Sequence, residues 1–214
     1  MAVDLNDVRQ EYAKPGLKLE DLSADPLNQF QHWLEAAVDS GIHEPNAMCL
    51  ATVNADGAPS TRIVLLKYFS EKGLTFFTNY ESRKALDIAV NAQVAVNFQW
   101  LPLHRQVNIT GVAQRVCKAE TVKYFLSRPF ASQLGAWCSP QSQVIASRAV
   151  LDEAWHKMKQ KYSQGEVPVP GHWGGYRIEP SCIDFWQGGA GRLHDRFRYS
   201  KDATGEWMCQ RIAP

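Results

Sequence analysis

Apolar residues recur at three- and four-residue steps in several stretches of the chain, which predicts amphipathic helices. In the first stretch, Leu27, Phe30 and Leu34 form one apolar face. Asp25 is the expected N-cap of this helix, and Gly41 is the expected stop. The predicted helices cover residues 26–40, 82–92, 118–128 and 147–162.

Segments rich in β-branched and aromatic residues alternate with turn residues, which predicts short strands. The predicted strands cover residues 47–53, 61–68, 74–78, 93–100, 105–116, 174–178, 182–187, 192–199 and 206–212. The turns between the early strands are too short for crossover helices, so the strands are expected to be antiparallel. The pattern predicts a mainly β fold with added helices (α+β), arranged as a Greek-key-like barrel.

Composition narrows the class of protein. The chain has 214 residues, 45% of them hydrophobic, which is enough for one continuous core. Its 23 Lys and Arg residues balance 22 Asp and Glu residues, so no overall field would draw it to nucleic acid or to a membrane surface. The charged N-terminus lacks a secretory pattern, and five scattered cysteines fit neither a disulfide framework nor a zinc site. We therefore expect a cytoplasmic protein with no metal.

Familiar catalytic and nucleotide motifs are missing from the sequence. It contains no GxxxxGK[ST], GxSxG or HExxH motif, and its glycine-rich run at residues 188–191 lies between two predicted strands instead of opening a helix. P-loop, Rossmann, α/β-hydrolase and zinc-peptidase chemistry are therefore disfavoured.

Basic residues gather around the predicted meander. Arg62 and Lys67 flank an apolar run, and Ser82, Arg83 and Lys84 open a predicted helix. Free backbone N–H groups and the positive end of the helix dipole favour an anion at such a helix start. These residues can form a phosphate site, although a basic pair at a helix start is more often a solvated surface feature.

Two further polar sets are candidates for binding. Tyr124 and Arg128 lie four residues apart on a predicted helix, with Ser132 beyond its end, and could hold a second phosphate. A surface Tyr/Arg stack is the alternative. In a predicted strand, Arg192, His194 and Arg196 would share one face, which could be a binding surface or simply an exposed polar face.

Five segments of the chain together resemble the pyridoxine/pyridoxamine 5′-phosphate oxidase family. They are RIVLLK (62–67), FFTNYESRK (76–84), RQVNITG (105–111), YFLSRPFASQLGAW (124–137) and FWQGGAGRLHDRF (185–197). The similarity covers nearly the whole chain. It implies an FMN-binding split β-barrel, residues 21–214, preceded by a mobile lid, residues 1–20, and a homodimer with FMN at the subunit interface.

The resemblance also implies roles for individual residues. The expected FMN contacts are Arg62, Ile63, Val64, Leu65, Leu66, Lys67, Phe77, Thr78, Arg83, Lys84, Gln106, Gln141, Ser142, Trp186 and Arg196. The expected substrate contacts are Arg9, Tyr12, Lys67, Tyr124, Arg128, Ser132, Arg192, Leu193 and His194. Of these, Arg192 and His194 are the catalytic candidates: arginine can stabilise negative charge, and histidine can orient the substrate or handle a proton.

The implied activity is oxidation of pyridoxine 5′-phosphate and pyridoxamine 5′-phosphate to pyridoxal 5′-phosphate. In it, a hydride passes from C4′ to flavin N5, and O2 is reduced to H2O2. Two alternatives remain: a flavin reductase on the same barrel, which would use a nicotinamide donor, and a carrier that binds flavin or pyridoxal phosphate without turnover.

Overall fold

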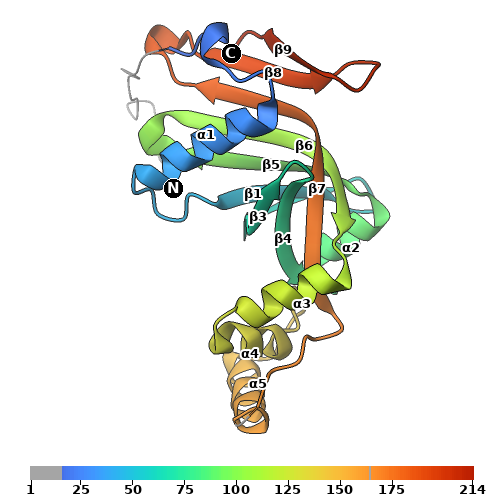
Figure 1. Ribbon diagram of the computed structural model, residues 1–214. Helices are drawn as coiled ribbons and strands as arrows, with labels where there is room; N and C mark the ends of the chain where they lie inside the picture. The colour runs from blue at the N-terminus through green and yellow to red at the C-terminus, as the bar shows by residue number, and fades with distance from the viewer. Residues whose placement is uncertain (1–15, 164) are drawn as a thin grey trace, which may run out of the picture. The chain divides into compact units, whose positions relative to one another are not determined.

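The structure is a computed structural model that describes residues 16–163 and 165–214 (Figure 1). Its helices are α1 (Pro26–Asp39), α2 (Arg83–Val90), α3 (Lys118–Ser127), α4 (Phe130–Cys138) and α5 (Arg148–Lys161). Its strands are β1 (Ala47–Val53), β2 (Pro59–Leu65), β3 (Tyr68–Ser70), β4 (Gly73–Asn79), β5 (Gln93–Trp100), β6 (Arg105–Arg115), β7 (Trp173–Gln187), β8 (Asp195–Lys201) and β9 (Trp207–Arg211). The prediction of a mainly β fold with added helices is confirmed.

The strands form one sheet in the order β2-β1-β5-β6-β7-β4-β3, to which β8 is joined through β7 and β9 through β8. The long strand β7 has two antiparallel partners. Its first part, Trp173–Ile178, pairs with β4, and its last part, Cys182–Gln187, pairs with β8. This pairing puts the two predicted strands at residues 174–178 and 182–187 into one continuous element.

The chain divides into two compact units, each built from separate stretches of sequence. The first unit takes the described residues up to Cys49, Ala95–Thr110 and Pro180–Pro214. The second unit takes Leu50–Val94 and Gly111–Glu179. The predicted split into a lid and one domain stays a prediction.

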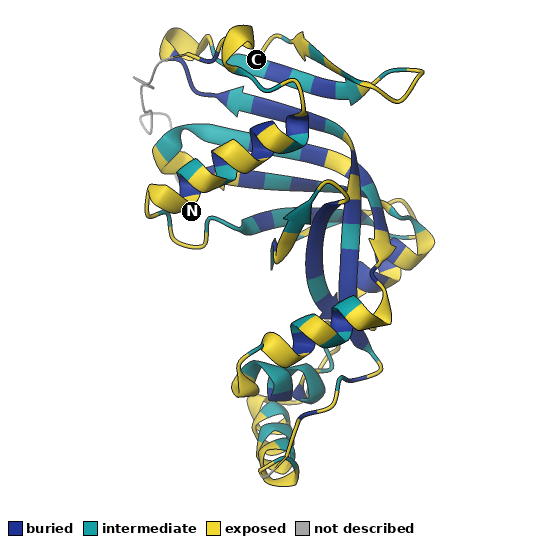
Figure 2. Ribbon diagram, in the orientation of Figure 1, coloured by how far each residue is buried: buried dark blue, intermediate teal, exposed yellow. Residues whose placement is uncertain are grey.

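Each unit has an apolar core. In the first unit, Phe30 of α1 lies 5.0 Å from Phe98, and Trp33 packs edge-on against Phe185 at 5.1 Å. The buried positions of α1 follow the expected helical spacing, and they show as dark bands that recur along the helix in Figure 2. Asp25 caps α1 by accepting a hydrogen bond from the backbone of Leu27.

In the second unit, a core cluster links α3 and α4 to the start of β7. Phe125, Leu134, Val167 and Trp173 are its buried members. Trp155 and Met158 of α5 pack against this cluster from outside, and α5 itself has no buried residue. Helices α3 to α5 therefore cover the part of the sheet where β7 begins.

Two predicted strands are wrong in their bounds. The strand predicted at residues 61–68 is broken into β2 and β3, because Leu66 and Lys67 lie outside the strand ladder. The backbone N–H of Lys67 donates to the carbonyl of Thr75 instead. The strand predicted at residues 192–199 begins only at Asp195. Gly191 and Arg192 both have a φ of 61°, which a strand cannot accommodate.

Helix α4 is missing from the predictions, which placed Ser132 beyond a helix end. Pro129 separates α3 from α4, so the chain restarts a helix immediately after leaving one. Within the stretches that the structure covers, no helix is long and apolar enough to cross a bilayer. The cysteines of the described residues are all free thiols.

Candidate active site

A cavity of about 540 Å³ lies in the second unit. Strands β2, β4 and β7, helices α2 to α4 and the segments next to them supply its lining. The residues that line it are Ile63, Val64, Leu65, Lys67, Phe77, Thr78, Asn79, Lys84, Tyr124, Arg128, Pro129, Ser132, Gly135, Ala136, Ser139, Gln141 and Trp173. Most of the predicted flavin contacts and all of the predicted substrate contacts of this unit therefore share one cavity, whose charged lining among the described residues is entirely cationic.

One end of the cavity is built around the buried ammonium of Lys84. Its Nζ donates to Gln141 Oε1 at 2.7 Å, to Ser82 Oγ at 3.1 Å and to Thr78 Oγ1 at 3.2 Å. Burial, together with the charge of Arg62, lowers the pKa of Lys84 to about 8. A cation that is desolvated and held only by neutral acceptors is a suitable partner for a phosphate.

Ser82 does not cap α2 with its side chain, although it stands at the N-cap position. Its hydroxyl donates to the carbonyl of Asn79 and accepts from Lys84 instead. Ser82 therefore holds Lys84 in place and does not cap the first N–H groups of α2.

A second part of the cavity lining is a stack of aromatic rings. Phe77 lies 4.0 Å from Tyr124 and 5.5 Å from Trp173, with interplanar angles of 26° and 14°. Burial raises the pKa of Tyr124, against the opposing effect of the Arg128 charge, so its hydroxyl remains a donor at neutral pH.

Arg128 is the second cation of the cavity. Its guanidinium lies 4.7 Å above the ring of Trp173. Its Nη1 is buried and has no hydrogen-bond partner among the described residues. A buried guanidinium N–H without an acceptor is costly, so this atom is suited to an anionic ligand. Arg128 ends α3 in extended conformation, and the predicted set of Tyr124, Arg128 and Ser132 does meet in the cavity.

Four expected flavin contacts of this unit do not line the cavity. The guanidinium of Arg62 points to Thr52 and Ser60, at 2.6 and 2.5 Å. Leu66 is turned into the core. Arg83, the first residue of α2, and Ser142, with a φ of 73°, are both exposed.

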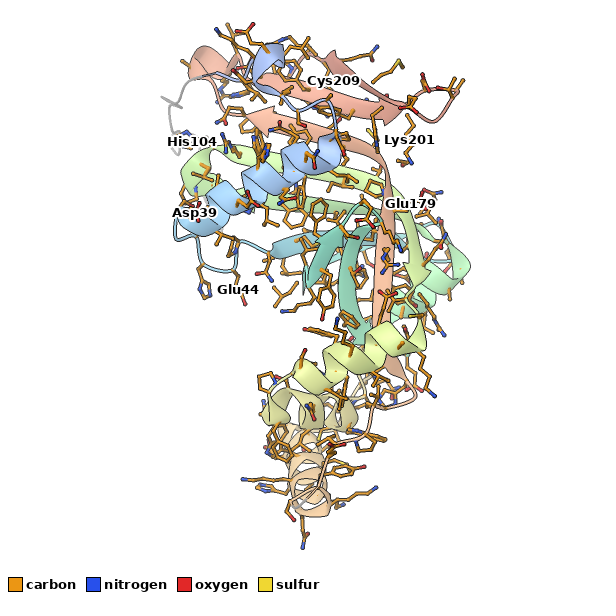
Figure 3. The ribbon with its side chains drawn as sticks, viewed as in Figure 1. Asp39, Glu44, His104, Glu179, Lys201 and Cys209 are labelled. Atoms are coloured by element: carbon orange, nitrogen blue, oxygen red, sulfur yellow. The ribbon has the colours of Figure 1, made fainter. Side chains whose placement is uncertain are left out.

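The remaining predicted residues belong to the first unit, where residues 188–193 form a tight turn, called here the glycine turn. The carbonyl of His104, at the end of the β5–β6 connection (Figure 3), accepts from the backbone of Gly188 and from Gln187 Nε2. A Cβ at Gly189 would lie 2.5 Å from the carbonyl oxygen of Leu193, so only glycine fits there. The turn exposes Arg192 and Leu193.

His194 is fixed at the end of the glycine turn. Its Nδ1 accepts the backbone N–H of Gly189 at 3.1 Å, and its ring lies 4.6 Å from that of Trp186. Because Nδ1 accepts a hydrogen bond, the neutral ring carries its proton on Nε2. The prediction that Arg192, His194 and Arg196 share a strand face is wrong, since only Arg196 belongs to β8.

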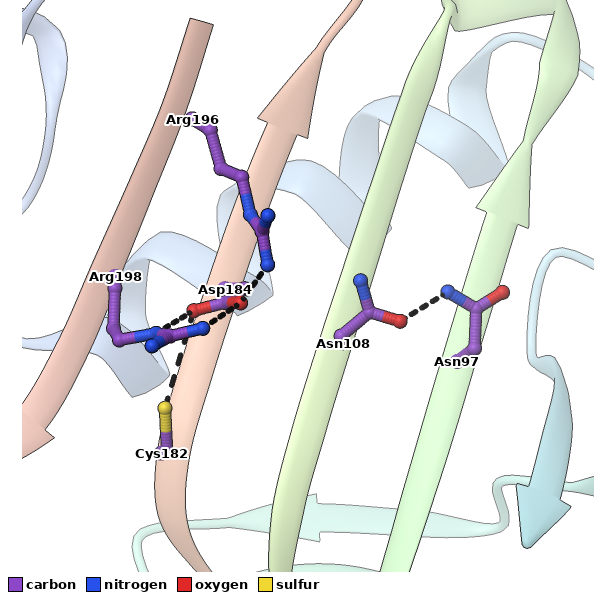
Figure 4. Close-up of polar contacts among 6 residues, drawn as sticks. All are labelled: Asn97, Asn108, Cys182, Asp184, Arg196 and Arg198. Atoms are coloured by element: carbon purple, nitrogen blue, oxygen red, sulfur yellow. Dashed lines mark hydrogen bonds and ion pairs between the residues drawn. The ribbon is translucent and has the colours of Figure 1, made fainter. Parts of the chain in front are cut away.

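Arg196 is held by a buried carboxylate. Its Nη2 donates to Asp184 Oδ2 at 2.7 Å, and Arg198 donates to both oxygens of the same carboxylate (Figure 4). Burial acts to raise the pKa of Asp184, but the hydrogen bonds from the two arginines outweigh it and the pKa lies below its usual value. Gln106 is half-buried on β6, and Arg9 and Tyr12 lie outside the described residues.

Comparisons with known proteins identify the family of the chain. A sequence profile described as pyridoxamine 5′-phosphate oxidase matches residues 34–162. A second, described as the pyridoxine 5′-phosphate oxidase C-terminal dimerisation region, matches residues 173–214. The chain belongs to the pyridoxamine 5′-phosphate oxidase family. The resemblance seen in the sequence motifs is therefore confirmed.

Relatives in this family match over their full length. Proteins named pyridoxine/pyridoxamine 5′-phosphate oxidase from Crocosphaera subtropica and Hahella chejuensis are each 52% identical to this chain, over 99% and 98% of it and 100% and 99% of their own sequences.

Solved structures confirm the split-barrel α+β fold. PhzG from Burkholderia lata 383, solved in complex with tetrahydrophenazine-1-carboxylic acid, superposes with a TM-score of 0.86 at 27% identity, covering 91% of this chain and 95% of its own. A pyridoxamine 5′-phosphate oxidase-related, FMN binding protein from Nostoc punctiforme has a TM-score of 0.72 at 17% identity, over 90% and 100% of the two chains, and shows the same fold.

Several lining residues were not predicted from the sequence. They are Asn79, Pro129, Gly135, Ala136, Ser139 and Trp173. Most of them lie on or beside α4, the helix that was missed. The four-residue spacing of Phe130, Leu134 and Cys138 is the signal that could have found it.

Proposed function

We propose that this protein oxidises pyridoxine 5′-phosphate and pyridoxamine 5′-phosphate to pyridoxal 5′-phosphate, with FMN as its cofactor. The observation that carries the proposal is the 52% identity, over nearly the full length of both chains, to relatives named for this activity. The cavity of the second unit adds independent support, because it combines a buried lysine and a half-buried arginine with a flat aromatic wall.

The chain's own residues fit a flavin phosphate at the Lys84 end of the cavity. Lys84 is desolvated there, Arg62 is close enough to depress its pKa, and Gln141 and Thr78 are already hydrogen-bonded to it or to one another. We assign the phosphate to Lys84, which lines the cavity, and to Arg62 and Arg83, which would reach it from outside the lining. Ile63, Val64 and Leu65 of β2 line the cavity and would contact the flavin rings.

The substrate phosphate is assigned to the Arg128 end. Arg128 supplies an N–H that lacks an acceptor within the described residues, Tyr124 supplies a hydroxyl donor, and Ser132 and Lys67 line the same cavity. An anion bound to a guanidinium and a hydroxyl is fixed in orientation as well as in position. The phosphate grip would therefore hold the pyridine ring of the substrate in one orientation.

When bound, FMN supplies the two-electron acceptor for oxidation at C4′, and O2 takes up those electrons to give H2O2. Arg192 would hold the substrate ring and stabilise negative charge on it, because its guanidinium is permanently charged. His194 would donate from Nε2, since Nδ1 is occupied by Gly189. Trp186 and Arg196 would contact FMN as its remaining partners.

We further infer a homodimer with FMN at the subunit interface, touched by both chains. The match of residues 173–214 to a dimerisation region supports this arrangement. Large apolar side chains exposed at Ile63, 64%, and Leu193, 80%, are suited to be covered by a second copy. Light scattering of the purified protein should give twice the chain mass, and a monomer that still binds FMN would contradict it.

A single assay distinguishes this proposal from a flavin reductase or a carrier. The purified protein is loaded with FMN and mixed in air with pyridoxamine 5′-phosphate, or separately with a reduced nicotinamide. We expect peroxide and aldehyde in equal amounts from the first mixture and no rapid flavin reduction in the second. Flavin reduction by the nicotinamide alone would identify a reductase, and binding without turnover would identify a carrier.

A further inference from the structure

Asp87 of α2 is a buried carboxylate beside a site assigned to a phosphate. Its side chain is 5% exposed, and it lies in the same unit as Lys84 and Arg62. A negative charge there opposes the binding of a dianion, so we expect Asp87 to make a favourable interaction at this site. Its hydrogen bonds suggest what that interaction is.

Two hydroxyls connect Asp87 to Arg62. Thr52 Oγ1 donates to Asp87 Oδ2 at 2.7 Å, and Ser60 Oγ donates to the same oxygen at 3.3 Å. In turn, Thr52 Oγ1 accepts from Arg62 Nη1 at 2.6 Å, and Ser60 Oγ accepts from Nη2 at 2.5 Å. The two hydroxyls therefore bridge a carboxylate on α2 to a guanidinium on β2.

The direction of these bonds is set by the carboxylate. A hydroxyl has one proton, and an ionised carboxylate only accepts, so the proton of each hydroxyl turns towards Asp87. The lone pairs of both hydroxyls are then left for Arg62, and hydrogen bonds in such a chain strengthen one another. Thr52 is fully buried, so its rotor has no water to turn towards.

We propose that Asp87 is a positioning residue for FMN: through Thr52 and Ser60 it fixes the guanidinium of Arg62 in the orientation that receives the flavin phosphate. This inference rests on the proposed function, and in particular on the assignment of the phosphate to Arg62 and Lys84. It makes the phosphate end of the cavity preformed, since Arg62 is held before any ligand arrives.

The test compares two flavins in the apoprotein. FMN and riboflavin share the same ring system, but only FMN has the phosphate. Affinities for both are measured by quenching of flavin fluorescence in the wild type, Asp87→Ala and Asp87→Asn. Asp87→Ala removes the acceptor, and we expect it to weaken FMN by about tenfold while riboflavin changes by less than about twofold.

Asp87→Asn separates positioning from charge. The amide keeps an oxygen that accepts from both hydroxyls but has no negative charge, so FMN affinity should stay within about threefold of the wild type. If the carboxylate acts only by repelling the phosphate, both variants will bind FMN more tightly, which overturns the proposal. Equal loss of FMN and riboflavin in Asp87→Ala would also overturn it, because that pattern indicates general distortion.

Further variants keep the proposal testable if Asp87→Ala does not fold. Thr52→Val removes one bridging hydroxyl with little change of shape and should weaken FMN alone, even if Asp87→Ala does not fold. In an Arg62→Ala background, Asp87→Ala should have no further effect on FMN. Asp152→Ala, which removes a surface carboxylate paired with Arg148 on α5, is the matched control and should change neither affinity.

The two ways of failing are distinguishable. If the wild type binds no FMN, the proposed function falls and the positioning role falls with it. If the wild type binds FMN better than riboflavin but Asp87→Ala leaves that preference intact, only the positioning role is wrong.

Discussion

The cavity of the second unit and the glycine turn of the first unit hold their cations in opposite ways. Lys84 of the cavity is buried and bonded to three neutral acceptors, and Arg62, which lies outside the cavity lining, is bonded to two hydroxyls. In the glycine turn, Arg192 is exposed on a backbone with a φ of 61°. Under the proposed function, the cavity would be preformed for binding, and the exposed arginine would act on the bound substrate.

Arg196 shows that this contrast is not simply one between the two units. It is tied directly to Asp184, which is 7% exposed. A cation paired this closely has part of its charge neutralised before a ligand binds. The comparison therefore predicts that substitutions in the cavity mainly reduce affinity, and that substitutions in the glycine turn mainly reduce turnover.

The largest expected effect is that of Arg192→Ala. Because the side chain is exposed, its loss should leave the fold and FMN affinity nearly unchanged. Turnover with pyridoxamine 5′-phosphate should fall by about 100-fold or more, as expected for a lost charge-stabilising contact. Steady-state kinetics and flavin titration of the same sample measure both. Equal loss of turnover and FMN occupancy would place Arg192 in the cofactor site.

Arg128→Ala should give the reverse pattern. The loss of a charged phosphate contact costs about 1.5–3 kcal/mol, so KM for pyridoxamine 5′-phosphate should rise by roughly 10- to 100-fold. Pyridoxamine, which lacks the phosphate, is the control substrate. The wild type should use it poorly, and Arg128→Ala should use it no more poorly than the wild type does. A fall in kcat at unchanged KM would remove Arg128 from the phosphate site.

FMN affinity should depend on pH through Lys84. Its pKa of about 8 means that the ammonium is charged below pH 8 and loses its proton above it. The flavin phosphate stays dianionic in this range, because its second pKa is about 6. Affinity should therefore fall above pH 8, by up to about tenfold per pH unit. Lys84→Met should bind more weakly and lose this slope, and an equally steep slope in the variant would assign it to another group.

The smallest expected effect is that of Gly189→Ala. The added Cβ would force the carbonyl of Leu193 and the adjacent His194 to move, so turnover should fall by about fivefold while FMN affinity holds. Gly171→Ala, whose Cβ would meet nothing within 4 Å, is the control. Wild-type turnover in Gly189→Ala would show that the position of His194 matters little.

Local sequence signals predicted the antiparallel strands and four of the five helices. Helix α1 and strand β1 follow from periodicity and turn residues, and their bounds agree closely with the prediction. Helix α4 was missed because Pro129 and Arg128 interrupt the apolar pattern, and the helix is stabilised mainly by packing of Leu134 into a distant cluster.

The site was predicted less completely than the fold. Lys84, Tyr124 and Arg128 were found because their chemistry and spacing suggested phosphate binding, and the cavity brings them together. The glycine-rich run was predicted to lie between two strands, but Arg192 and Leu193 at the end of the glycine turn were wrongly predicted as strand, because alternation in the sequence does not reveal positive φ angles. The bridge from Asp87 to Arg62 joins residues 25 positions apart through the side chains of Thr52 on β1 and Ser60 on β2, which no local pattern encodes.

The most direct test of the central claim is an assay of the FMN-loaded protein with pyridoxamine 5′-phosphate in air, followed by absorbance of the aldehyde and by peroxide release. We predict one pyridoxal 5′-phosphate and one H2O2 for each substrate consumed, with much slower turnover of unphosphorylated pyridoxamine. A protein that binds FMN yet leaves both vitamers unchanged would contradict the account.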